Sequence, residues 1–221
     1  AIIERMNLEV FSNLDLLSVG IAVAAIGILG FTVFFNNPKS ITNKTFLGFA
    51  LVAILWNIAN YASTLPLNKE IAVWVVRGVL FPAVWYCFFL FQIFYVFPRH
   101  QVRFPFYYRF VLVPLAIFAS LLTLTPWVFS DIQTSSWDGR IERVDVAPGI
   151  FVFGITVVFF IGSGFFTLLK KILNAHLQTK RALQVILAGA AITFLLYIIF
   201  NFIFPAFLNN TRFIPLGAVF T

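Results

Sequence analysis

A few polar side chains embedded in otherwise apolar segments are the residues of this chain with the capacity for chemistry. Helical spacing places them at a similar depth around Arg77, the only charged residue well inside an apolar run. Lipid offers such groups no partner, so they should face the interior of a helix bundle. The pattern predicts a polar ligand-binding pocket that is open to the outside. The candidate binding residues are Arg77, Asn57, Asn60, Tyr61, Thr156, Tyr197 and Asn201.

Each of these residues also has a purely structural interpretation. An arginine only two turns inside a helix can extend its side chain to the membrane interface, and buried asparagines often just hold helices together. The convergence of several polar groups at one depth favours the pocket more than any single residue does. The ligand class stays open between a lipid, a quinone, a peptide and a small acid.

The remaining reactive side chains do not indicate catalysis. His100 and His176 fall in hydrophilic loops, and neither has a carboxylate or second metal ligand nearby in the sequence. Cys87 is the only cysteine, so no disulfide framework can form within the chain. The sequence has no HExxH motif, Gly-rich phosphate loop or nucleophile elbow. We therefore expect no catalytic residue, no metal and no cofactor within this chain.

Membrane-spanning helices are the elements that must position the polar residues. Of the 221 residues, 61% are hydrophobic and 10% are charged, and the mean hydropathy is +0.98. Soluble domains are far less apolar and more charged. Crossing a hydrocarbon layer of about 30 Å takes about 20 apolar residues in a helix. Six runs meet this requirement, at 16–35, 46–65, 71–97, 106–128, 149–173 and 182–208.

A seventh apolar stretch begins at residue 212 and spans only about 15 Å by Thr221. A backbone that ended inside the bilayer would leave carbonyl groups unpaired, so we expect the natural chain to continue. The predicted fold class is an all-α integral membrane protein. It is a seven-transmembrane helix bundle with its seventh helix truncated here, and residues 1–221 form one domain.

The distribution of charge predicts the orientation. Alternate loops carry nine basic residues and no acid, namely Lys39, Lys44, Arg99, Arg103, Arg109, Lys170, Lys171, Lys180 and Arg181. All eight acids lie in the N-terminal segment and in the other loops. The positive-inside rule then places the N-terminus outside and the basic loops in the cytoplasm. The net charge of +7 therefore reports topology, and no nucleic-acid partner is expected.

Aromatic residues make up 19% of the chain, and the densest run is WYCFFLFQIFYVF at 85–97. Such a run could line a cavity for a planar or lipidic ligand. The more common arrangement, which we expect here, has Phe facing lipid and Trp or Tyr at the interface. Pro82, Pro114 and Pro205 fall inside predicted spans. Small residues within the spans favour close helix packing, namely Gly20, Ala24, Gly27, Gly30, Gly162, Gly164, Ala188 and Gly189.

Several short motifs are shared with a known family: Asn43-Lys44-Thr45-Phe46, Trp56, Phe97-Pro98, Pro114, Arg181, Gln184, Gly189 and Pro205. In these features the chain resembles the N-terminal seven-transmembrane sensor region of bacterial histidine kinases. The resemblance implies a sensory input domain in the cell inner membrane, working as a homodimer. It also implies that helix seven leads to cytoplasmic kinase domains in the same chain. A ligand in the outer pocket would then bias the output by shifting the population of helix arrangements.

Two other functions compete with the sensor. A small transporter or channel subunit would need a polar path across the bilayer, for which Gln92, Tyr95, Ser163 and Thr167 are candidates. A retinal-binding photoreceptor would need a Schiff-base lysine in the last helix and usually a carboxylate counter-ion. None of the six complete predicted spans has a Lys or an acid well inside it.

Overall fold

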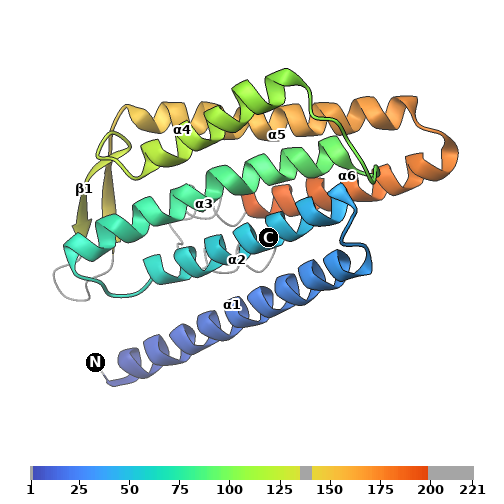
Figure 1. Ribbon diagram of the computed structural model, residues 1–221. Coiled ribbons are helices and arrows are strands. Elements are labelled where there is room, and N and C mark those ends of the chain that lie inside the picture. The colour runs from blue at the N-terminus through green and yellow to red at the C-terminus, as the bar shows by residue number, and fades with distance from the viewer. Residues whose placement is uncertain (1, 135–140, 199–221) are drawn as a thin grey trace.

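A computed structural model describes residues 2–134 and 141–198, and the side chains of 16–131, 145–176 and 179–196 (Figure 1). The seventh predicted helix and the last part of the sixth lie outside the described residues. In chain order the elements are α1 (Ile2–Asn36), α2 (Ile41–Ser63), α3 (Lys69–Val96), the π-helical turn η1 (Tyr108–Leu112), α4 (Val113–Thr123), β1 (Phe129–Thr134), β2 (Ile141–Val146), α5 (Gly149–Asn174) and α6 (Leu177–Ile198).

Helix α3 is the centre of the bundle. It packs against α2, α4, α5 and strand β1, whereas α1 packs along α2 and α6 along α5. The helices run alternately up and down, so their connections gather at two ends (Figure 1). We call the end with the β1–β2 hairpin and residues 64–68 the hairpin end. The end with residues 37–40, 97–107 and 175–176 is the cationic end.

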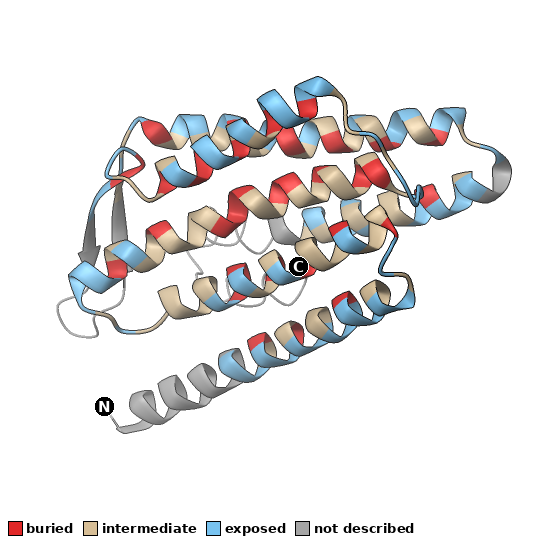
Figure 2. Ribbon diagram, viewed as in Figure 1, coloured by how far each residue is buried: buried red, intermediate tan, exposed pale blue. Residues whose placement is uncertain are grey.

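The helices have the length and surface of membrane spans. Within the described residues, five helices are long and apolar enough to cross a membrane: Leu16–Asn36, Ile41–Ser63, Lys69–Val96, Gly149–Asn174 and Thr179–Leu196. Many of their large apolar side chains are exposed, and Figure 2 shows such exposed positions along α1 and α5. Lipid would cover these surfaces, which in water would be an aggregation hazard. The chain is therefore a multi-pass helical membrane protein.

Several predicted boundaries differ from the structure. Helix α2 starts at Ile41 and not at residue 46, and α6 starts at Leu177 and not at residue 182. The predictions followed apolar side chains, but helical backbone hydrogen bonds continue into the polar turns that precede them. The same reason explains why α1 extends back to Ile2.

The fourth predicted span is the one that differs most. Instead of a helix over 106–128, the apolar helix covers Tyr108–Thr123 and opens with a π-turn. Pro114 has no N–H to donate to the carbonyl of Phe110, and Val113 N–H bonds back to Tyr108 O in the wider π pattern. Pro126 then prevents the helix from continuing, and the chain enters the hairpin.

Aromatic side chains of α3 fill the interior of the bundle. Phe88 and Phe91 pack with Tyr108 and with Phe160 of α5 in one buried cluster. Phe94 packs in a second cluster with Leu168, Ile172 and Leu183, which joins α3 to α5 and α6. The expectation that the phenylalanines of this run face lipid is wrong for these three. A helix surrounded by three others must bury side chains on most of its faces.

Two of the glycines predicted to allow close packing, Gly30 and Gly164, lie at tight helix contacts, whereas no described atom lies within 4 Å of a Cβ at Gly20, Gly162 or Gly189. A Cβ at Gly30 of α1 would lie 2.6 Å from Ala50 Cβ of α2. A Cβ at Gly164 of α5 would lie 3.3 Å from the Cα of Phe91 in α3. At these two positions the neighbouring helices lie so close together that a larger side chain would clash.

Candidate functional site

Arg77 lies at the hairpin end of α3 and is 7% exposed. Its Nη2 donates a hydrogen bond of 3.0 Å to the backbone carbonyl of Phe129, at the start of β1. The guanidinium carbon lies 5.4 Å from the ring centroid of Trp74, one helical turn away. The Nε–H is buried and has no partner within the described residues. The buried cation therefore ties α3 to the hairpin, and its Nε–H is a buried donor that no described residue satisfies.

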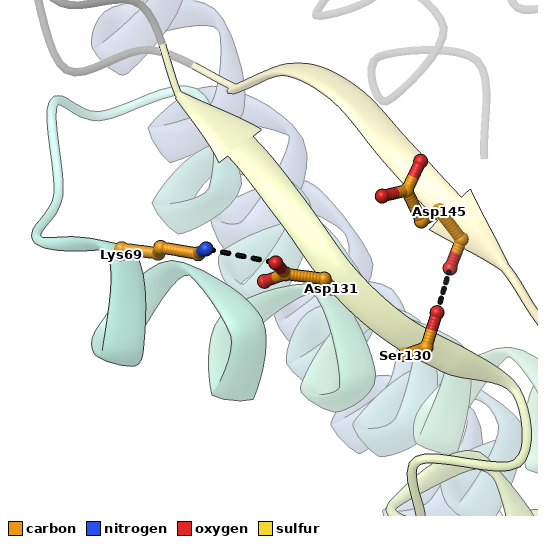
Figure 3. Close-up of polar contacts among 4 residues, drawn as sticks. All are labelled: Lys69, Ser130, Asp131 and Asp145. Atoms are coloured by element: carbon orange, nitrogen blue, oxygen red, sulfur yellow. Dashed lines mark hydrogen bonds and ion pairs between the residues drawn. The ribbon is translucent and has the colours of Figure 1, made fainter.

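A second contact joins the same two elements. Lys69, the first residue of α3, pairs with the Asp131 carboxylate of β1 at 2.8 Å, as Figure 3 shows. Both side chains are about half exposed, so water weakens this ion pair. Within the hairpin, Ser130 donates its hydroxyl hydrogen to Asp145 O at 3.2 Å (Figure 3). The pairing skips Ser130 between Phe129 and Asp131, which is the pattern of a β-bulge.

The candidates on α2 bond to their own helix. Asn57 is 1% exposed, and its Nδ2 donates to Ala53 O at 2.9 Å. Asn60 donates in the same way to Trp56 O at 2.9 Å. Tyr61 is half-buried one residue further along. Arg77 makes no hydrogen bond to any of these three residues in the part of the chain that is described.

The candidates on the last two helices are placed only in part. Thr156 of α5 is 3% exposed, and its hydroxyl donates to Val152 O of the same helix at 2.8 Å. Tyr197 belongs to α6, but its side chain is outside the described set, and so is the whole of Asn201. Arg77, Asn57 and Thr156 are therefore all buried inside the bundle, as expected for polar groups on apolar helices. Each of the three has a hydrogen-bond acceptor within the protein.

The cationic end of α3 is held by a second cation. Lys171 of α5 directs its ammonium at the last carbonyls of α3, where Phe94 O, Tyr95 O and Phe97 O accept at 2.9, 2.6 and 2.7 Å. These three bonds use all three donors of the lysine. A positive charge at this position also complements the negative end of the helix dipole. Lys171, predicted as a loop residue, thus caps α3 from the neighbouring helix.

Two loops at the cationic end are also bonded together. The backbone N–H of Ile41 donates to His100 O at 3.0 Å, and the Thr42 hydroxyl donates to Arg99 O at 2.7 Å. The His100 ring lies 3.4 Å from the Ser40 hydroxyl. His100 therefore takes part in a loop contact, and this contact joins the start of α2 to the segment that follows α3.

The hairpin and the Lys171 cap are the features of the candidate site that sequence reasoning missed. The alternation of Val and Ile with charged residues at 141–146, preceded by Asp138-Gly139, is a strand and turn signal. Nothing in residue types could indicate the Lys171 cap, because its acceptors are main-chain carbonyls. Among the described residues, no three His, Cys, Asp or Glu side chains form a group able to hold a metal ion.

Comparison with known proteins adds no further constraint. No protein-family model matches the chain, and no curated protein matches it either. The class of the protein therefore follows from its fold alone, as a multi-pass helical membrane protein with a small strand hairpin at one end.

Proposed function

We propose that this chain is the membrane-embedded sensory input domain of a two-component histidine kinase. In this proposal seven helices cross the inner membrane, the N-terminus and the hairpin end lie outside, and the cationic end lies in the cytoplasm. A ligand acts at the hairpin end, and cytoplasmic kinase domains in the same chain, working as a homodimer, receive the signal. The positive-inside rule supports this orientation.

The observation that carries the proposal is the attachment of one central helix at both ends. Arg77 connects α3 to the hairpin, and Lys171 connects the other end of the same helix to α5. Between these points α3 is packed by the buried aromatic clusters. Packed interiors are stiff, so a displacement of α3 at the hairpin end would reach the loops at the other end.

Arg77 is the residue most suited to receive the ligand. Among the described residues its buried Nε–H has no acceptor, and the guanidinium donates to a single neutral carbonyl. A ligand carboxylate or phosphate would make a stronger, charge-assisted hydrogen bond than that carbonyl does. Ligand binding could thus compete with Phe129 for Arg77 and loosen the hairpin from α3.

The transporter hypothesis has less support from the described residues. Ser163 and Thr167, two of the residues considered for a polar path, donate to carbonyls of their own helix, Phe160 O and Ser163 O. Phe91 and Phe160 pack between α3 and α5 in the same region. A transport path there would require these aromatic contacts to separate.

Sequencing the gene beyond the codon for Thr221 tests the proposal. A completed seventh helix followed by a dimerisation segment and histidine-kinase domains is the expected result. A stop codon soon after a seventh helix would contradict it and would move transport ahead of signalling. In the full-length protein, Arg77→Met should alter the autophosphorylation rate, whereas the exposed Lys69→Gln change should leave it close to the original.

A further inference from the structure

The cationic end carries a cluster of charged side chains that the sensory proposal does not use. We define the cationic cradle as Lys39 and Lys44, which flank the start of α2, together with Arg99 and Arg103, which follow α3. All four side chains are exposed. Lys44 lies in the first turn of α2 and the other three lie in the two connecting segments, all at the same end of the bundle (Figure 1).

The backbone fixes the two halves of the cradle relative to each other. Ile41 N–H and the Thr42 hydroxyl, which lie between the two lysines, donate to the carbonyls of His100 and Arg99. Both acceptors lie within the segment that carries the two arginines. The four cations therefore belong to one bonded unit and not to two independent loops.

The charge of the cradle is not neutralised within the described part of the chain. None of its four side chains makes an ion pair or a side-chain hydrogen bond there. The described acids lie at the hairpin end or in the first half of α1, which starts at that end. The carbonyls at the end of α3 could have attracted Arg99, but Lys171 already occupies them.

The surroundings of the cradle indicate the kind of anion it would meet. Phe35, at the end of α1, is 69% exposed, and Phe106, shortly after Arg103, is 75% exposed. Exposed phenylalanines on a membrane protein face acyl chains, and lysines and arginines at the ends of spans lie at headgroup level, so the two kinds of residue together fit a lipid. A soluble polyanion would leave these rings in water, whereas a phospholipid offers a phosphate to the cations and acyl chains to the rings.

We propose that the cationic cradle binds the headgroups of anionic phospholipids in the adjoining leaflet. Lys39, Lys44, Arg99 and Arg103 supply the cations, and Phe35 and Phe106 contact the acyl chains. This goes beyond the general positive-inside bias, because it assigns the lipid to one bonded pair of loops. It does not depend on the signalling role of the chain.

The test measures phosphatidylglycerol binding to the purified, detergent-solubilised chain by native mass spectrometry, with phosphatidylcholine as the neutral comparison. The double variant Lys44→Gln/Arg99→Gln should raise the dissociation constant of the first bound phosphatidylglycerol by at least about fivefold. Lys180→Gln/Arg181→Gln removes the same charge from the same end outside the cradle. That control should change the constant by less than the cradle variant does.

Several results would overturn the proposal. They are equal affinity for the two lipids, an unchanged constant in the cradle variant, and an equal loss in the two double variants. Displacement of the lipid by glycerol phosphate at comparable concentration would show a plain phosphate site and would also overturn it. The single variants Lys44→Gln and Arg99→Gln apply the same criterion if the double variant does not fold. Arg99→Lys keeps the positive charge and should therefore bind phosphatidylglycerol more tightly than Arg99→Gln does.

Discussion

The two ends of α3 are held by different means, although each uses one buried or half-buried cation. At the cationic end, Lys171 donates to three carbonyls and has no donor left over. At the hairpin end, Arg77 donates to one carbonyl and keeps a buried Nε–H that has no partner in the described part of the chain. A saturated contact resists rearrangement, whereas an unsatisfied one gains by finding a new acceptor. The comparison indicates a fixed end and an adjustable end on one helix.

The largest effect is expected from removing the saturated contact. Lys171→Met leaves three carbonyls at the end of α3 without their donor and should lower the free energy of unfolding by about 2–3 kcal/mol. Unfolding in mixed micelles with a rising fraction of denaturing detergent measures this loss. Lys170→Met is the matched control, because Lys170 is exposed and donates no side-chain hydrogen bond within the described residues. Equal losses in the two variants would remove the distinction between the ends.

The next largest effect is expected at the close contact between α5 and α3. Gly164→Val places a branched side chain against Phe91 and Phe94 and should cost about 1–3 kcal/mol through overpacking. Gly162→Val on the same helix is the control, because no described atom lies within 4 Å of a Cβ built there. Both are read out by the same unfolding experiment. A Gly164 variant as stable as the Gly162 variant would contradict the close approach of α3 and α5.

At the adjustable end the expected change is local. Arg77→Met breaks the contact with Phe129 O and should speed backbone hydrogen exchange in β1 by about tenfold, with a smaller change in global unfolding than Lys171→Met gives. Hydrogen–deuterium exchange read by mass spectrometry on the peptide covering residues 129–134 measures it. Arg77→Lys retains a cationic donor, so its exchange rate in β1 should fall between those of the original protein and of Arg77→Met. Unchanged exchange in the methionine variant would show that the hairpin is held by other contacts.

The smallest effect is expected at the exposed ion pair. Lys69→Gln should change the free energy of unfolding by less than about 0.5 kcal/mol, because both partners are half exposed and water and salt screen their attraction. Asp131→Asn should behave in the same way, and high salt should reduce both effects. A loss above about 1 kcal/mol would make this pair, and not Arg77, the main attachment of the hairpin.

The sequence predicted the spans better than the contacts between them. The fifth span, expected over 149–173, is observed as Gly149–Asn174, because apolar length alone determines such an element. The burial of Arg77 and Asn57 also followed from helical spacing. The partner of Arg77 could not be predicted, since it is a main-chain carbonyl 52 positions away and every residue carries one. The fourth span was predicted too long, because its end depends on Pro126 and on the hairpin beyond it.

A contact that ends on a main-chain oxygen has a consequence for how this protein can change over evolutionary time. Any residue at position 129 still presents its carbonyl, so the hairpin can exchange nearly all of its side chains without losing Arg77 as an anchor. The hydrogen bonds from Lys171 likewise set no requirement on the side chains at positions 94, 95 and 97, although the buried Phe94 ring is constrained by its packing. Descendants of this chain should therefore keep the two cations, while the hydrogen bonds themselves place no restriction on the side chains at the acceptor positions. Contacts between side chains usually appear in related sequences as correlated substitutions. The two contacts at the ends of α3 should produce no such correlation.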